Sequence, residues 1–271
     1  MKTLSVCIVT FHVERELFTS VLTALSAAVD EALQTNMIVA AELTIVDNGD
    51  GGDHSFLTAS ADSLPLLSTR LIENSKNHGF GRGHNQGLAD RDSDFHLILN
   101  PDAILAPDAL IHGLGHLLAH PGSVLVSPYV ENAKGGQEFL CKRYPSVLDL
   151  FIRGFFPRRL RHMAEKRLAR YECRDYDEAE VHEGVVIASG CCMLARTRAL
   201  QDVNGFHERY FLYFEDFDLS LKLAKLGRID FVPSMRIVHY GGSASRKGLS
   251  HIAMFCRSAF TFFMRNGWKL A

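Results

Sequence analysis

The sequence lacks the features that would place it in several common protein classes. It has no run of about 18 uncharged apolar residues, so no segment is predicted to cross a membrane. Its six cysteines show no paired C-x-x-C spacing, and reduced thiols in a cytoplasmic protein are their simplest account. Its net charge is only −2, so the chain as a whole has no attraction for nucleic acid.

Internal repeats and low-complexity segments are also absent, and the first residues lead directly into a strand pattern, so no signal peptide is expected. What remains is an ordinary globular composition. Of the 271 residues 47% are hydrophobic, and the mean hydropathy is +0.02. This length can bury one sizeable core, and a single domain is expected.

Short apolar runs alternate with helical patterns over the first hundred residues. Helices are predicted at 14–33 and near 83–89, and strands at 4–10, 41–46, about 69–72 and 95–99. This rhythm indicates right-handed parallel crossovers, in which ligands bind outside the carboxyl ends of the strands. The polar residues Thr10, Asp47, Asn77 and Asp102 all lie at such ends.

The second part of the chain has a mixed pattern. Pro107 begins a predicted helix at 107–120, and Gly227 ends another at 219–226. The remaining elements are a hairpin turn around 134–136, strands at 124–130, 185–195, 229–232 and 236–239, and an amphipathic helix at 250–264.

Two segments carry most of the chemistry. The apolar run 97–99 ends in Asn100-Pro101-Asp102, as when a buried strand delivers polar groups to a cleft. The second segment places Glu215, Asp216 and Asp218 within four positions and adds His239 after another apolar run. Such a group of carboxylates with a histidine suggests a divalent metal or a proton-transfer site.

With these motifs in order, the chain resembles the inverting glycosyltransferases of family 2, which have the GT-A fold, and most of all their rhamnosyltransferase branch. The resemblance covers nearly the whole chain. Its motifs lie at 5–11, 45–48, 77–87, 100–102, 189–190 and 205–242. It implies one α/β domain with a Rossmann-like nucleotide-binding half and a mixed central sheet. The halves would be 1–102 for the nucleotide-sugar and 103–249 for acceptor and catalysis, with 250–271 as a C-terminal helix.

The resemblance also implies which residues hold the donor, a dTDP- or UDP-linked sugar. Asp102 would hold Mg²⁺ or Mn²⁺ at the diphosphate, with His239 completing the ligand set. Asn100 replaces the first acid of the family's D-x-D motif, which lowers the charge of the site. Asp47 would accept a hydrogen bond from a pyrimidine base, and Phe11 could pack on that base. The full set of donor-binding residues is Thr10, Phe11, Asp47, Asn77, Gly79, Asn100 and Asp102.

Each of these residues also has a plainer interpretation. Asn-Pro-Asp at 100–102 can be a turn, and Asp47 can close its strand as an Asx-turn. The glycines at 81, 83 and 87 do not have the spacing of a dinucleotide fingerprint, so NAD binding is rejected. A loop that approaches the nucleotide, with a helix N-terminus behind it, is the preferred interpretation of 77–87.

Inverting transfer needs a base for the acceptor hydroxyl, and a carboxylate suffices. By resemblance the base is Asp216, with Glu215 positioning a substrate hydroxyl or supporting the loop. Asp218 is expected to cap a helix that begins near Leu219. The plain alternative is that all three acids decorate a helix start. Six aromatic residues between 206 and 217 favour a half-buried cleft instead.

The segment 149–170 contains seven basic and two acidic residues, a net charge of +5, and Phe151, Ile152, Phe155 and Phe156 are interleaved with them. An anionic membrane surface is the partner that this pattern suggests. Nucleic acid and a solvated helix face are the alternatives. The membrane interpretation gains weight because acceptors in this family are often polyprenyl-diphosphate glycans.

The leading hypothesis is therefore a metal-dependent inverting glycosyltransferase at the inner face of the cytoplasmic membrane. It would move a sugar, plausibly L-rhamnose from dTDP-rhamnose, onto a cell-surface glycan. A sugar nucleotidyltransferase is an alternative, but the first strand–helix turn at 11–15 lacks a glycine-rich phosphate loop. A catalytically silent nucleotide-sugar-binding subunit is the other alternative, against which the intact Glu215-Asp216 pair argues.

Overall fold

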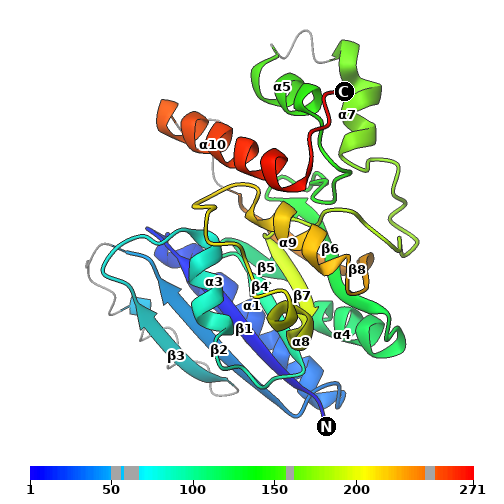
Figure 1. The fold of residues 1–271 in the computed structure, drawn as a ribbon. Helices are drawn as coiled ribbons and strands as arrows, with labels where there is room; N and C mark the ends of the chain where they lie inside the picture. Colours follow the sequence, from blue (N-terminus) through cyan, green and yellow to red (C-terminus); the bar gives the residue numbers. More distant parts are fainter. Residues whose placement is uncertain (50–55, 58–66, 157–161, 242–247) are drawn as a thin grey trace.

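The structure is a computed structural model that describes residues 1–49, 56–57, 67–156, 162–241 and 248–271. Within these ranges one mixed sheet runs through the molecule, with helices on both of its faces (Figure 1). The strand order is β3-β2-β1-β4-β7-β6-β8-β5. The first four strands in this order are parallel to one another, as the alternating strand–helix pattern predicts.

The parallel half of the sheet matches the sequence prediction. Strand β1 is followed by a long helix, and a glycine-rich loop leads from β3 into a short one. The helix near 83–89 begins earlier than predicted, at Phe80. The elements of this half are β1 (Thr3–Thr10), α1 (Arg15–Gln34), β2 (Ala40–Asp47), β3 (Ser68–Glu73), α3 (Phe80–Leu88) and β4 (Phe95–Leu99).

In the other half, β7 runs antiparallel to both β4 and β6, and β5 runs antiparallel to β8. The elements here are β5 (Ala103–Leu105), α4 (Ala109–Ala119), β6 (Ser123–Asn132), β7 (Cys192–Arg196), α8 (Thr197–Asp202), α9 (Glu215–Leu223) and β8 (Arg228–His239). The mixed central sheet that the sequence predicts is thereby confirmed.

Two strand predictions in this half are wrong in detail. The strand predicted at 185–195 begins only at Cys192, because the preceding residues form isolated bridges and a turn at Gly190-Cys191. The two short strands predicted at 229–232 and 236–239 form one strand, β8. The register of β8 against β6 shifts between Val232 and Arg236. Residues 233–235 therefore form a bulge within one strand and not a break between two strands.

The sheet is covered on both faces, and alternate residues of its strands serve opposite cores. Leu97 and Leu99 of β4 join the larger core under α1 and α4, whereas Ile98 joins the second core under α8 and α9. A period of two along a strand sends neighbouring side chains to opposite faces. Four of the five residues of β4 are apolar for this reason, and the fifth, His96, is buried with its Nδ1 2.7 Å from the hydroxyl oxygen of Ser5.

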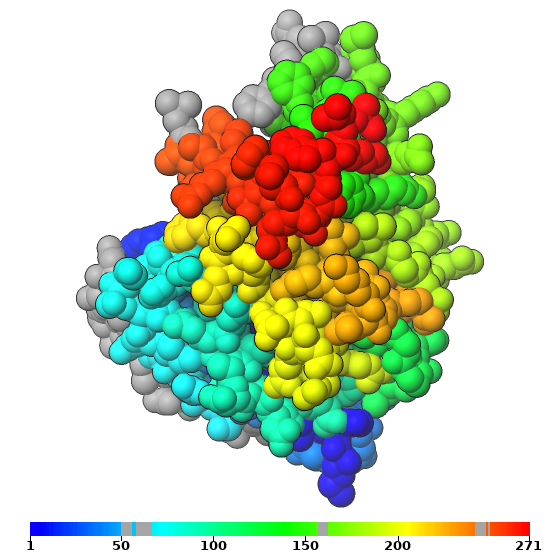
Figure 2. All heavy atoms as spheres, viewed as in Figure 1, coloured from blue at the N-terminus to red at the C-terminus, as the bar shows by residue number. Residues whose placement is uncertain are grey.

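A further group of helices lies beyond the end of the sheet, at the top of Figure 1, and its green and orange-to-red atoms form the top of the space-filling view in Figure 2. It consists of α5 (Val147–Phe155), η1 (His162–Ala164), α7 (Glu165–Tyr171) and α10 (Leu249–Asn266). An aromatic core of its own joins this group to α9: Tyr210, Phe214 and Phe262 pack there with Leu150 and Tyr171. Four of the six aromatic residues between 206 and 217 belong to this core, so they pack α10 against α9.

The expected capping role of Asp218 is wrong. Helix α9 begins at Glu215, so Asp218 lies within its first turns, and its side chain is only 1% exposed. Its carboxylate accepts hydrogen bonds from Tyr210, Arg265 and Asn266 at 3.1–3.2 Å. Asp218 is thus an anchor between α9 and the C-terminal end of α10.

All six cysteines are free, and Cys256 is the exposed one. Among the helices of the described ranges, none combines the length and apolar character that crossing a bilayer requires. The division into a donor half (1–102), an acceptor half (103–249) and a C-terminal helix (250–271) stays a prediction.

Candidate active site

The carboxyl ends of β1 and β2 bring Thr10 and Asp47 together. The two residues are register partners, and the Thr10 hydroxyl donates to Asp47 Oδ1 at 2.8 Å. The same oxygen accepts the backbone N–H of Gly49 at 3.0 Å, which is the Asx-turn that was the plainer interpretation of Asp47. Both side chains are almost fully buried, and Phe11 beside them is 47% exposed. The pair is held rigidly, with an accessible aromatic ring next to it.

The loop after β3 is fixed to this corner by its glycine. Gly79 has φ +86°, and a Cβ there would lie 2.3 Å from the carbonyl oxygen of Phe211. The Asn77 side chain accepts the Gly79 N–H at 2.8 Å, and Asn48 donates to the Gly79 carbonyl at 3.0 Å. The glycines of α3 have a packing role, since a Cβ at Gly87 would lie 2.2 Å from Cys7 Sγ.

The cavity beside Asn77 is separate from the cavity at Glu215 and Asp216, the acid pair. It has a volume of about 490 Å³ and lies between this loop and α10. It shares none of its lining residues with the cavity at Glu215 and Asp216. Asn77 and the acid pair are therefore not brought to one cavity.

Asp102 and His239 meet because β5 and β8 pair. Ala103 is the register partner of His239, so Asp102, one residue earlier, faces the imidazole. The distance from His239 Nε2 to Asp102 Oδ1 is 3.3 Å, and that from Nδ1 to Glu138 Oε2 is 2.9 Å. No signal in the sequence points to Glu138, which reaches His239 from the chain that follows β6.

These carboxylates change the protonation of the histidine. Burial disfavours the charged ring, but hydrogen bonds to Asp102, Cys191 and Glu138 outweigh it and raise the pKa of His239 to about 12. A site that holds a proton this strongly has a concentration of negative charge. A divalent cation bound at this charge would displace the proton from Nε2 of His239, because only a neutral imidazole can be a metal ligand.

The first turn of α9 presents the acid pair. Tyr213 and Phe214 both have positive φ, +71° and +65°, a conformation that costs non-glycine residues energy and is common at functional sites. This strained turn starts the helix at Glu215. Asp216 Oδ2 then accepts the Gly190 N–H at 3.0 Å, and Oδ1 accepts the Phe217 N–H at 2.9 Å.

The two acids differ in their surroundings. Glu215 is 5% exposed, and its Oε2 has no hydrogen-bond partner among the described residues. Burial and the neighbouring Asp216 raise the pKa of Glu215 to about 8. Burial also raises the pKa of Asp216, but backbone N–H groups of Gly190 and Phe217 favour its ionised form. At neutral pH the proton of the pair therefore resides on Glu215.

The acid pair opens into a cavity of about 200 Å³. Cations line it as well, since Lys142 and Arg153 are among its residues. Burial, followed by the charge of Arg153, lowers the pKa of Lys142 to about 8. The cavity is therefore a polar site of limited size, walled by aromatic rings from Tyr171, Tyr213, Phe214, Phe217 and Phe255.

One loop connects the acid pair to the Asp102–His239 pair. Gly190 donates to Asp216, while the carbonyl of Cys191 accepts the Asn100 N–H at 2.8 Å. The Cys191 thiol is in turn hydrogen-bonded to His239. The loop exists because β7 runs antiparallel to β4, which places Cys192 opposite Leu99. The two pairs thus lie on either side of residues 189–191.

The chain is similar to known glycosyltransferases. A family model described as glycosyltransferase like family 2 matches residues 2–253. The N-acetylglucosaminyl-diphospho-decaprenol L-rhamnosyltransferase of Mycobacterium tuberculosis is 27% identical over 245 residues, which cover 83% of this chain and 75% of that protein. Rhamnosyltransferase WbbL of Escherichia coli K12 is 28% identical over 200 residues, 69% of this chain and 71% of that protein.

Among solved structures, the mannosyltransferase PcManGT from Pyrobaculum calidifontis, in complex with GDP-Man and Mn²⁺, has a TM-score of 0.61 to this chain. It is 17% identical, and the match covers 98% of this chain and 76% of that one. This likeness confirms the expected GT-A fold.

Proposed function

This chain belongs to glycosyltransferase family 2, and from that premise we propose that it moves L-rhamnose from dTDP-rhamnose onto a polyprenyl-diphosphate-linked glycan. One observation carries the proposal: Asp216 lines a polar cavity and is joined through residues 189–191 to the Asp102–His239 pair. An inverting transferase needs these two parts together, a base for the acceptor and a site for the donor diphosphate. The rhamnosyl specificity rests on the two named relatives.

Asp216 is the base of the proposed reaction. It takes the proton of the acceptor hydroxyl while that oxygen forms a bond to the anomeric carbon. The bond from this carbon to the diphosphate oxygen breaks, and the nucleoside diphosphate leaves with the bonding electrons. The backbone N–H groups of Gly190 and Phe217 hold the Asp216 carboxylate in place. Glu215, protonated beside it, can donate a hydrogen bond to a substrate oxygen.

The residues at the donor end fit a divalent cation. Among the described residues, no group of three or more His, Cys, Asp or Glu side chains is arranged to hold a metal. Two ligands are enough for Mg²⁺ or Mn²⁺ when phosphates and water supply the rest, and Asp102 and His239 offer two. Glu138 would hold the other ring nitrogen, as an outer carboxylate commonly does for a metal-bound histidine. The ion would neutralise charge on the leaving diphosphate.

The transfer reaction is the direct test of this function. We expect the purified protein with Mn²⁺ to release dTDP from dTDP-rhamnose only when a polyisoprenyl-diphospho-N-acetylglucosamine acceptor is added. The product lipid should gain the mass of one rhamnose. UDP- and GDP-sugars at the same concentration serve as controls for the donor. Formation of dTTP and rhamnose 1-phosphate when inorganic pyrophosphate is added to dTDP-rhamnose would instead indicate a nucleotidyltransferase, and donor binding without turnover would indicate a silent subunit.

Peripheral attachment to the inner face of the cytoplasmic membrane is part of the proposal. The described cations of 149–170 do not all support it, since Arg153 pairs with Glu172 and Arg167 with Asp149. Arg158, Arg159 and Arg161 lie outside the described residues. Exposed apolar side chains on α5, α10 and the C-terminal segment give stronger support: Phe151 is 51% exposed, Phe260 58% and Trp268 51%.

Co-sedimentation with vesicles tests the attachment. We expect the protein to sediment with vesicles that contain anionic lipid, and salt to weaken this binding. Replacing Phe260 and Trp268 together by Ser should release it, because their rings would no longer enter the interface. Val39→Ser is a matched control, since Val39 is 47% exposed but lies next to the N-terminal strand. Equal sedimentation of the double variant and the wild type would contradict the assignment of this face.

A further inference from the structure

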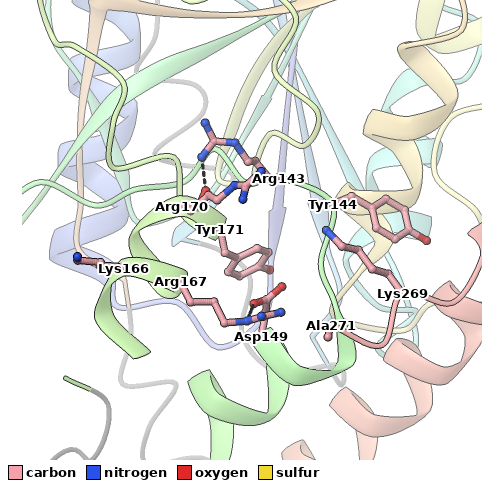
Figure 3. Close-up of a pocket in the computed structure, with 9 residues that line it drawn as sticks. All are labelled: Arg143, Tyr144, Asp149, Lys166, Arg167, Arg170, Tyr171, Lys269 and Ala271. Atoms are coloured by element: carbon pink, nitrogen blue, oxygen red, sulfur yellow. Dashed lines mark hydrogen bonds and ion pairs between the residues drawn. The ribbon is translucent and has the colours of Figure 1, made fainter. Parts of the chain in front are cut away.

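A basic cavity lies next to the acid-pair cavity, between α5, α7 and the C-terminal segment (Figure 3). Its volume is about 480 Å³. Figure 3 shows Lys166 and Lys269 on opposite sides of the group of lining residues. Five cations and one carboxylate line it, together with two tyrosines and Ala271: Arg143, Lys166, Arg167, Arg170, Lys269 and Asp149.

Much of this charge has no counter-ion among the described residues. Arg167 pairs with Asp149 at 2.6 Å, and Arg143 pairs with Asp175 at 2.7 Å. Lys166, Arg170 and Lys269 make no ion pair with any described residue. Because like charges repel one another across the cavity, an anion with several oxygens would be held strongly there.

Tyr171 adds a second, independent sign of a ligand. Its side chain is 3% exposed, and its hydroxyl has no hydrogen-bond partner among the described residues. A buried donor without a partner costs free energy that a bound acceptor would recover. Tyr171 lines both the basic cavity and the cavity of Glu215 and Asp216, so it marks the boundary between them.

An apolar groove borders the acid-pair cavity as well. It has a volume of about 230 Å³ and is formed by α5, α10 and Trp268. Leu150 and Phe255 line both this groove and the acid-pair cavity. Asp149, the residue before Leu150, lines the basic cavity. Helix α5 therefore has the basic cavity on one side and the apolar groove on the other. Each of them borders the cavity that the proposed base, Asp216, lines.

We propose that Arg170, Lys269 and Tyr171 bind the diphosphate of the acceptor, while the apolar groove between α5 and α10 takes the first isoprene units of its lipid. This inference rests on the proposed function and names the part of the acceptor that the protein recognises. The sugar hydroxyl would lie at Asp216 and the diphosphate beyond Tyr171. The apolar chain would then leave the basic cavity past the C-terminal segment, where Lys269 of the cavity follows Trp268 of the groove. A diphosphate carries several oxygens and more than one negative charge, which suits the unpaired cations.

Direct binding tests the proposal without any transfer reaction. We expect calorimetry to show that geranyl diphosphate binds at least tenfold more tightly than geraniol and more tightly than inorganic pyrophosphate. The double variant Arg170→Glu, Lys269→Glu should lose at least tenfold in affinity for geranyl diphosphate. Tyr171→Phe removes only the hydroxyl and should lose severalfold. Arg198→Glu is the matched control, since Arg198 is an exposed arginine of α8 that pairs with Asp202.

Each other outcome has a defined meaning. Equal binding of geraniol and geranyl diphosphate would overturn the diphosphate site. Equal binding of pyrophosphate and geranyl diphosphate would reduce the site to an anion pocket and remove the apolar groove from it. If anionic vesicles bind in a way that the double variant abolishes, and geranyl diphosphate does not bind, the cations recognise phospholipid headgroups and the proposal is wrong. Thermal unfolding of each variant shows whether it is folded.

Kinetics separates this proposal from the proposed function. With the lipid acceptor, the double variant should raise KM for the acceptor at least tenfold and leave KM for the nucleotide-sugar unchanged. If wild-type protein transfers no sugar to any acceptor yet binds geranyl diphosphate as expected, the proposed function fails and the diphosphate site stands. If transfer occurs and the double variant has an unchanged KM for the acceptor, the diphosphate site fails and the proposed function stands.

Discussion

Asp216→Asn is expected to lower kcat by about a thousandfold while the affinity for the nucleotide-sugar stays nearly unchanged. A positioned general base contributes about 10²–10⁴ in rate, and the amide cannot accept the proton of the acceptor hydroxyl. Because Asn has nearly the same shape, most of the loss should appear in kcat rather than in KM. Single-turnover measurement of dTDP release, with calorimetry of donor binding, checks both parts.

The hydrogen bonds of Asp216 require a second variant. In the wild type each carboxylate oxygen accepts a backbone N–H, from Gly190 and from Phe217. The amide group of Asn would turn a donor toward one of these N–H groups, so the loop 189–191 could move. Asp216→Ala, which removes the base without this conflict, should show a similar loss of kcat.

Glu215→Gln is the matched comparison. Glu215 is protonated at neutral pH in this environment, since burial raises its pKa to about 8. Gln is neutral and still offers a hydrogen-bond donor, so this variant should retain much more activity than Asp216→Asn. The reverse order of the two losses would move the base from Asp216 to Glu215.

Removing either Asp102 or His239 is expected to weaken metal-dependent binding of dTDP at least tenfold. With two protein side chains offered to the ion, loss of one leaves a single ligand besides phosphate and water. Glu138→Gln should weaken the same binding by about 10–100-fold, because an outer carboxylate orients and polarises a metal-bound histidine. Calorimetry of dTDP with Mn²⁺ and with chelator measures these differences.

The chelated samples provide the internal control for this prediction. Without the ion, wild type and the variants should bind dTDP with similar, weak affinity. His112→Ala is a control for loss of a histidine, since His112 is an exposed residue of α4 paired with Asp108. If dTDP binds wild type equally with Mn²⁺ and with chelator, Asp102 and His239 have no metal role.

The sequence by itself determined the parallel half of the sheet and the positions of most site residues. Alternation of apolar runs with helical patterns defined the strands, and polar residues after the runs marked their carboxyl ends at Thr10, Asp47 and Asp102. This works because these signals are local. A period of two or 3.6 residues and an abrupt change to polar residues are complete within one short segment.

Only the tertiary structure decided the features that depend on distant parts of the chain. Glu138 and His239 are 101 residues apart and meet through the pairing of β6 with β8. Helix α9 begins at Glu215 rather than near Leu219, because aromatic packing holds Tyr213 and Phe214 at positive φ. Asp218 is an anchor for α10 and not a cap because its partners, Arg265 and Asn266, come from a helix 47 and 48 residues further along the chain. Local propensity carries no information about such contacts, since packing between distant segments selects among conformations of similar local energy.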